Sequence, residues 1–151
     1  MIRFVLDTNS VSDLFANQEP ILSRVVAAGD EVATTVITVQ EVLSGWYTYL
    51  SQAETPDQII LAYERLGRAT AQLGRLPILP YSRTAFDHAA TLIRQHRNVR
   101  APDLRIAAIA LEAGAAVVTA NVRDFGRVPG LAVEDWTQPP APPPPVTGPR
   151  P

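Results

Sequence analysis

The stretch IRFVLDTNSVSDL, from Ile2 to Leu14, decides the expected fold. Its first five residues are nearly continuous in apolar character, which is typical of a strand buried on both faces of a parallel sheet. Asp7 ends this strand, and small polar residues follow it. One interpretation is local, because aspartate favours turns and helix starts. The other is chemical, because a strand tip holds a carboxylate rigidly for a metal or a substrate.

Strands and helices alternate along the rest of the chain. Strands are expected at residues 2–6, 32–37, 77–79, 115–119 and 131–134. Helices are expected at residues 10–16, 20–28, 38–50, 55–73, 82–96 and 102–114, with a helical turn at 121–125. The helix that starts at Thr55 is the clearest, since Thr55 can cap it and Pro56 and Asp57 suit its first turn. This alternation predicts an α/β fold, a layered sandwich with a mostly parallel sheet.

Length and composition predict one globular domain. Of the 151 residues, we assign 1–137 to the domain and 138–151 to a proline-rich tail that we expect to be extended and disordered. No apolar run approaches the roughly 20 residues that a membrane helix needs, and Asp7 comes too early for a signal peptide. The chain has no cysteine, which excludes disulfides and thiol chemistry and fits a reducing compartment. The expected location is the cytoplasm.

The distribution of charge excludes some enzyme classes. The net charge is −2, so no general affinity for nucleic acid follows from it, although residues 63–105 hold eight arginines and three acids. All 13 basic residues are arginine. Lysine is expected near the phosphate in haloacid-dehalogenase-type phosphotransferases, in receiver domains and in P-loops, so its absence weighs against all three. The first of these classes also carries a second aspartate where this chain has Asn9.

Four acids fall where the carboxyl ends of the strands should lie. Asp7 and Asp124 follow the first and fourth strands, Glu41 is expected in the first helical turn after the second strand, and Asp103 in the first turn of the helix at 102–114. Carboxylates gathered at one edge of a sheet repel one another, and burial favours their neutral forms. A divalent cation would neutralise them, and oxygen ligands without cysteine suit Mg²⁺ or Mn²⁺ rather than zinc.

Each acid also has a structural alternative. Asp7 could cap the helix that it precedes, and Pro102-Asp103 is an ordinary helix opening. Thr38-Val39-Gln40-Glu41 and Asn121-Val122-Arg123-Asp124 both have the spacing of a capping box. Spacing alone leaves open whether the four acids converge.

Four ordered segments resemble the motifs of PIN-domain proteins. They are Leu6-Asp7-Thr8-Asn9, Glu41-Val42 behind a β-branched strand, the segment 103–108 (DLRIAA) and the segment 119–125 (TANVRDF). The resemblance spans about residues 2–136, including the closing GLAVEDW at 130–136, and is strongest to VapC-type toxin ribonucleases of bacterial toxin–antitoxin pairs. It implies a three-layer α/β/α sandwich with a mostly parallel sheet, metal-dependent cleavage of RNA, a homodimer and inhibition by a small VapB-like antitoxin.

The resemblance also implies roles for individual residues. By motif, Asp7, Glu41 and Asp103 match the principal metal-site acids of the family. At the fourth position many relatives carry an acid where Asn121 stands, while others carry Asn there and an acid at the position of Asp124, as this chain does. Asp124 would then bind the metal through water or orient its neighbours. The supporting polar contacts would be Thr8, Asn9, Thr119 and Asn121.

The expected reaction is hydrolysis, in which water attacks the phosphodiester with the help of one or two Mg²⁺ or Mn²⁺ ions. Candidate RNA contacts are Arg94, Arg97, Arg100 and Arg105, with a solvated surface as the alternative. The helices at 38–50 and 55–73 could form a hairpin that meets a second protomer or the antitoxin, or that packs on its own core. The alternatives to a nuclease are a non-catalytic PIN-like interaction scaffold and a Mg²⁺-dependent phosphohydrolase.

Overall fold

A computed structural model describes residues 1–140 of the chain. Its five strands form one parallel sheet in the order β3-β2-β1-β4-β5. The bounds are β1 Phe4–Leu6, β2 Val32–Thr35, β3 Ile78–Leu79, β4 Ala116–Val118 and β5 Val133–Glu134. β1 lies at the centre, where Val5 pairs with Ala33 of β2 and with Val117 of β4. The predicted parallel sheet is confirmed.

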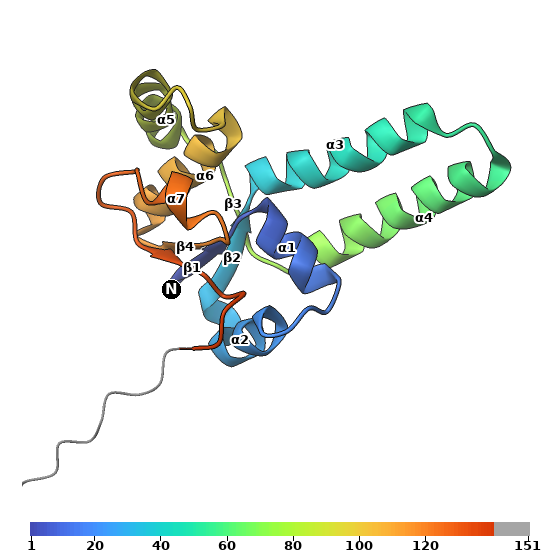
Figure 1. Cartoon of the computed structure of the whole chain (residues 1–151), viewed down its shortest axis with the longest axis horizontal. Coiled ribbons are helices and arrows are strands. Elements are labelled where there is room, and N and C mark those ends of the chain that lie inside the picture. The colour runs from blue at the N-terminus through green and yellow to red at the C-terminus, as the bar shows by residue number, and fades with distance from the viewer. Residues whose placement is uncertain (141–151) are drawn as a thin grey trace, which may run out of the picture.

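Helices cover both faces of this sheet (Figure 1). One face carries α5 (Arg83–Gln95), α6 (Ala101–Ala113) and α7 (Val122–Phe125). The other carries α1 (Thr8–Phe15), α2 (Ile21–Ala28) and the sheet-proximal ends of α3 (Val36–Gln52) and α4 (Pro56–Leu73). A short 3₁₀ turn, Gly29–Glu31, leads into β2. The α/β class and its three-layer α/β/α arrangement are therefore confirmed.

The apolar character of β1 follows from its position between these layers. Val5 belongs to the hydrophobic core under α5 and α6, and Leu6 belongs to the core under α1 and α2. Successive side chains of a strand point to opposite faces, so a strand covered on both sides needs an apolar residue at every position. Both side chains are fully buried, and each such burial stabilises the fold by about 1.5–3 kcal/mol.

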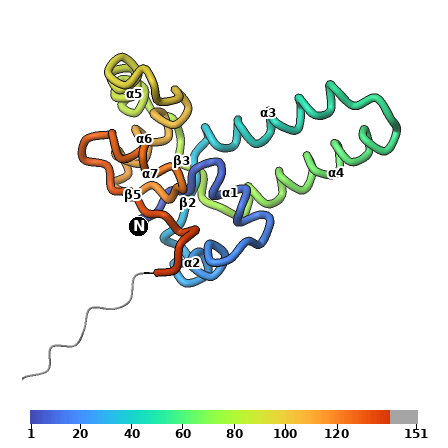
Figure 2. The backbone as a smooth tube through the Cα atoms, viewed as in Figure 1, coloured from blue at the N-terminus to red at the C-terminus, as the bar shows by residue number. Residues whose placement is uncertain are grey.

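α3 and α4 form a hairpin that projects from the rest of the molecule, as the tube in Figure 2 shows. α4 begins as predicted, with Thr55 and Gln58 forming a capping box. Large apolar side chains are exposed along the hairpin: Tyr47, Ile59, Ile60, Leu61 and Tyr63. The hairpin therefore offers apolar surface that its own core does not cover.

The junction between β2 and α3 differs from the prediction. β2 ends at Thr35, not Ile37, and α3 begins at Val36, not Thr38. Thr35 is extended, and its side-chain oxygen accepts a hydrogen bond from the backbone N–H of Thr38, so Thr35 is the cap. The predicted capping box from Thr38 to Glu41 is therefore wrong, and Glu41 lies in the second turn of α3 instead of the first.

Smaller differences occur at the two ends of the chain. β1 begins at Phe4 instead of Ile2, and α1 begins at Thr8 instead of Ser10, because Asp7 caps it. The predicted tail at 138–151 falls largely on residues 141–151, which lie outside the described residues. Among residues 1–140, no helix combines the length and the apolar character needed to cross a membrane.

Candidate active site

The carboxyl ends of β1 and β4 form the point at which the strand order reverses. β1 is followed along the chain by its neighbour β2, whereas β4, on its other side, comes later in the sequence. In open parallel sheets this is where ligands bind. The backbone N–H of Asp7 donates to the carbonyl of Val118 at 3.1 Å, and Ser10 Oγ donates to the same carbonyl at 2.9 Å. The two strand ends, and the side chains that follow them, are thereby fixed relative to each other.

Asp7 is both a helix cap and a buried carboxylate. Its Oδ1 accepts a hydrogen bond of 2.8 Å from the backbone N–H of Ser10, and the residue is 5% exposed. Burial raises the pKa of Asp7, while hydrogen bonds from Thr119 and Ser10 act in the opposite direction. A carboxylate offers about four acceptor positions on its two oxygens. The structural and the chemical interpretations of Asp7 are therefore compatible.

Glu41 is held at both of its carboxylate oxygens. Thr8 Oγ1 donates to Oε1 at 2.7 Å, and Arg100 Nη2 donates to Oε2 at 2.7 Å. The hydroxyl of Thr38, which is fully buried, lies 3.2 Å from that of Thr8. These contacts connect α1, α3 and the loop before α6, and they turn Glu41 toward the end of β1.

Asp103 is a buried carboxylate whose pKa is raised. The residue is 9% exposed and lies in the first turn of α6. Burial, and then the negative charges of Glu41, Asp7 and Asp124, raise the pKa of Asp103 to about 6, although the Arg100 guanidinium acts to lower it. Arg100 Nη1 lies 3.9 Å from Asp103 Oδ1. The pKa of Asp103 is thus raised mainly by burial and, to a smaller extent, by the negative charges of acids from three other segments.

Asn121 and Asp124 are partners of each other. Asn121 Nδ2 donates to Asp124 Oδ2 at 3.0 Å, and the backbone N–H of Asn121 donates to Thr119 Oγ1 at 2.9 Å. Asn121 precedes α7 but makes no side-chain capping bond to it, so the capping interpretation is wrong for this segment. Asn121 instead fixes the orientation of Asp124 beside the other acids.

Within residues 1–140, the other residues singled out from the sequence form no hydrogen bond or ion pair with the four acids. Asn9 is exposed on α1, and Arg105 is half-buried on α6. Arg94 and Arg97 line a recess together with Arg100. Sequence reasoning missed Ser10 and Thr38, which hold Asp7 and the Thr8 hydroxyl. The sequence did offer a signal for Thr38. Thr35 and Thr38 are three residues apart, which is the spacing between a helix cap and the residue whose backbone N–H donates to it.

The chemistry of the donor set fits a hard divalent cation, since the acids supply oxygen ligands. Within residues 1–140, no three acidic or histidine side chains lie close enough to share an ion as they stand. Arg100 already pairs with Glu41 and lies 3.9 Å from Asp103. A cation bound between these acids would compete with Arg100 for Glu41.

The PIN domain family model matches residues 4–131, a range that includes all four acids. The chain belongs to the PIN-domain family. The tRNA(fMet)-specific endonuclease VapC of Salmonella typhimurium is 30% identical over 141 residues, which are 90% of this chain and 99% of that protein. Ribonuclease VapC2 of Haemophilus influenzae is 31% identical over 141 residues, again 90% of this chain and 99% of its own length.

A solved structure extends the similarity to the fold. The DNA-bound VapBC of Salmonella typhimurium matches this PIN domain with a TM-score of 0.76 and 28% identity, covering 90% of this chain and 99% of that chain. The resemblance to PIN-domain proteins of the VapC type, expected from four short segments, is confirmed over nearly the whole described chain.

Proposed function

We propose that this PIN-domain protein is a VapC-type ribonuclease, the toxin of a toxin–antitoxin pair, and that it hydrolyses RNA with Mg²⁺ or Mn²⁺. The observation that carries the proposal is the placement of the acids: Asp7 follows β1 at the switch point of the sheet, and Arg100 pairs with Glu41 and lies 3.9 Å from Asp103. Buried acids near one another cost stability, so their presence at this edge of the sheet favours a role in chemistry. The names of the similar proteins, an endonuclease and a ribonuclease, support the same activity.

The residues of the site would have distinct roles. Asp7, Glu41 and Asp103 would hold the cation, and Asp124 would contribute directly or through water. When bound, the cation supplies positive charge that activates water and stabilises the charge developing on the phosphate. Thr8 orients Glu41 by its hydrogen bond of 2.7 Å, and Asn121 orients Asp124 by one of 3.0 Å.

Arg100 would be the cation of the site before a metal enters. Its guanidinium pairs with Glu41 and lies near Asp103, so it offsets part of the repulsion among the acids. A divalent ion carries twice the charge of this exposed arginine. Placed between the acids, it would therefore offset their repulsion more effectively. We therefore expect metal entry to release Arg100 from Glu41.

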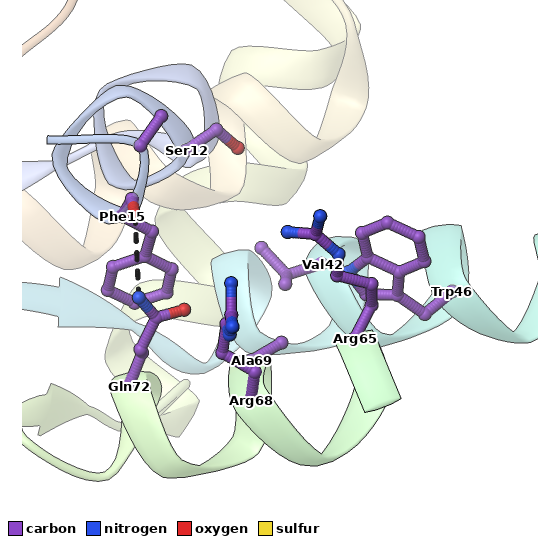
Figure 3. Close-up of a pocket in the computed structure, with 9 residues that line it drawn as sticks. Ser12, Phe15, Val42, Trp46, Arg65, Arg68, Ala69 and Gln72 are labelled. Atoms are coloured by element: carbon purple, nitrogen blue, oxygen red, sulfur yellow. Dashed lines mark hydrogen bonds between the residues drawn. The ribbon is translucent and has the colours of Figure 1, made fainter. Parts of the chain in front are cut away.

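An antitoxin and a second protomer are the proposed partners. A groove between α1 and the α3–α4 hairpin, shown in Figure 3, is lined by Ser12, Phe15, Ala16, Val42, Trp46, Arg65, Arg68, Ala69 and Gln72. A groove lined by apolar side chains together with Arg65 and Arg68 suits an amphipathic segment that carries acids, and we propose that a VapB-like antitoxin binds there. The similar Salmonella structure is of a VapBC complex, which supports such a partner. The exposed apolar residues of the hairpin would serve the homodimer.

The test is cleavage of total cellular RNA by the purified protein, with Mn²⁺, with Mg²⁺ and with a chelator. Asp7→Asn is the matched variant, because asparagine also caps helices but carries no charge. We expect discrete metal-dependent fragments from the wild type and none from Asp7→Asn. A folded wild type that cleaves no RNA with either metal would favour the non-catalytic scaffold instead. Equal cleavage by both proteins would exclude Asp7 from the site.

A further inference from the structure

A recess lined with arginines lies beside the four acids. Its volume is about 500 Å³, within the range of ligand sites in proteins. The end of α5, the start of α6 and the loop between them form it, with the lining residues Ile93, Arg94, Arg97, Val99, Arg100 and Ala101. The acid site described above does not use Arg94 or Arg97.

The loop that carries these arginines is anchored to the core. Val99 is 6% exposed and belongs to the hydrophobic cluster under α5 and α6. Its backbone N–H donates to the carbonyl of His96 at 3.1 Å, and the N–H of His96 donates to the carbonyl of Leu92 at 2.8 Å. Arg97 and Arg100 stand on either side of Val99, so the loop presents both from a fixed base.

Two of the three arginines in the recess have no acidic partner among the described residues, whereas Arg100 pairs with Glu41. No acid is among its lining residues. Arg94 donates a hydrogen bond to Thr91 Oγ1 at 3.2 Å, and within residues 1–140 neither Arg94 nor Arg97 forms an ion pair. Cations held near one another repel, and an anion bound between them would remove that repulsion. The recess therefore favours an anionic ligand.

Arg100 makes the recess continuous with the acid site. It lines the recess and also donates to Glu41 Oε2 at 2.7 Å. A polymer with evenly spaced negative charges can place one phosphate at the acids and a neighbouring phosphate among the arginines. The adjoining carboxylates repel any anion, RNA included, unless a metal covers them. An acidic protein segment could also fill the recess, but it offers no phosphodiester to the acid site beside it.

We propose that this recess is a phosphate subsite, which holds the backbone of a single-stranded RNA on one side of the phosphate to be cleaved. The inference rests on the proposed ribonuclease function and adds to it the place where the RNA chain lies beside the phosphate to be cleaved. The guanidinium fork of arginine matches the geometry of a phosphate group. Contacts to phosphates position a strand without reading its sequence, so the subsite should accept any RNA sequence equally.

The test is binding of short single-stranded RNA oligonucleotides of unrelated sequences, measured by fluorescence anisotropy in chelator at several salt concentrations. The variant is the double substitution Arg94→Gln with Arg97→Gln, both on exposed side chains. The control is Arg3→Gln with Arg83→Gln, which changes the net charge equally at two exposed ion pairs away from the recess.

We expect the recess variant to bind every RNA about tenfold more weakly, with the slope of log affinity against log salt reduced in magnitude by roughly 1.4 for two lost phosphate contacts. The control should bind RNA as the wild type does. Equal affinity and equal slope for the recess variant and the wild type would overturn the subsite. Loss of binding to a polyglutamate peptide, with RNA binding unchanged, would also overturn it and assign the recess to an acidic protein.

Cleavage with Mn²⁺, measured separately, distinguishes the subsite from the proposed function. A wild type that binds RNA through Arg94 and Arg97 but never cleaves it would contradict the ribonuclease and leave the subsite standing. A wild type that cleaves RNA, beside a recess variant that binds RNA normally, would contradict the subsite alone.

Discussion

Arg100 Nη2 donates to Glu41 Oε2 at 2.7 Å, joining two residues that are 59 positions apart in the sequence. The Glu41 side chain is 16% exposed, whereas that of Arg100 is 64% exposed. An ion pair with one partner in solvent contributes little to stability, about 0–1 kcal/mol. Water can therefore replace Arg100 beside Glu41 at little cost in free energy. Such a weak pairing suits a site where a metal ion is to take the place of the arginine.

Removal of this arginine should favour metal binding. In Arg100→Gln the carboxylates lose a competing positive charge, so we expect Mn²⁺ to bind up to about fivefold more tightly, in line with the energy of about 0–1 kcal/mol of an exposed pair. Isothermal titration calorimetry measures this, with Arg83→Gln as the control, since Arg83 pairs with Asp87 on α5. Weaker Mn²⁺ binding by Arg100→Gln would show that Arg100 does not compete with the metal.

Metal binding should depend on pH near the pKa of Asp103, which is about 6. A carboxylate must lose its proton to bind a metal, so affinity should rise as the pH rises through 6, with proton release on binding. Titrations at pH 6 in buffers of different ionisation enthalpy will detect that proton. Identical heats in all buffers would mean that Asp103 is already ionised or is not a ligand.

The same pKa predicts the stability of the metal-free protein. The pKa of Asp103 is raised from 3.8 to about 6 in the folded state, so folding favours its protonated form. The carboxyl therefore costs no stability below pH 3.8, and the cost grows as the pH rises toward 6 and is complete above it. Asp103→Asn should stabilise the metal-free protein at pH 7 by on the order of 1–2 kcal/mol and have little effect at pH 4.

Thermal unfolding of both proteins in chelator at the two pH values measures this effect. Mn²⁺ should then raise the unfolding temperature of the wild type more than that of Asp103→Asn, because a ligand stabilises only the state that binds it. A variant that is less stable than the wild type at pH 7 would contradict the repulsion among the acids.

The hydroxyl of Thr8 should matter for cleavage more than for folding. Thr8→Val removes the donor to Glu41 Oε1 and keeps the shape of the side chain. The loss of a hydrogen bond to a charged group is worth about 1.5–3 kcal/mol, so we expect RNA cleavage to slow by at least about tenfold. Thr8→Ser, which retains the hydroxyl, is the control. If Thr8→Val cleaves as fast as Thr8→Ser, Glu41 does not depend on this contact.

Much of the fold could be predicted from the sequence because its signals are local. The apolar residues of β1 reflect burial on two faces, and the start of α4 is set by Thr55 and its neighbours. The start of α3 was misplaced because Thr35 and Thr38 both suit a cap, and only the extended backbone of Thr35 decides between them. Such a choice depends on where β2 ends in the sheet.

The four acids of the candidate site could be named from the sequence, but the side chains that contact them could not. Each acid lies shortly after a strand or within the first two turns of a helix, so the topology of a parallel sheet predicts that they lie toward one edge. The contact of Arg100 with Glu41 depends on how the loop after α5 folds back on α3, which no local pattern contains. The sequence also could not predict the hydrogen bond from Asn121 to Asp124, because the same three-residue spacing fits a helix cap.

The central claim is that four acids from separate segments form one cation site, and Mn²⁺ binding followed by electron paramagnetic resonance tests it most directly. Titrations would compare the wild type with Asp7→Asn, Glu41→Gln and Asp103→Asn, and with Asp87→Asn on α5 as the control. We predict that Mn²⁺ binds the wild type and the control equally and binds each of the three site variants at least about tenfold more weakly. A folded wild type that binds no Mn²⁺, or three site variants that bind it as the wild type does, would contradict the account.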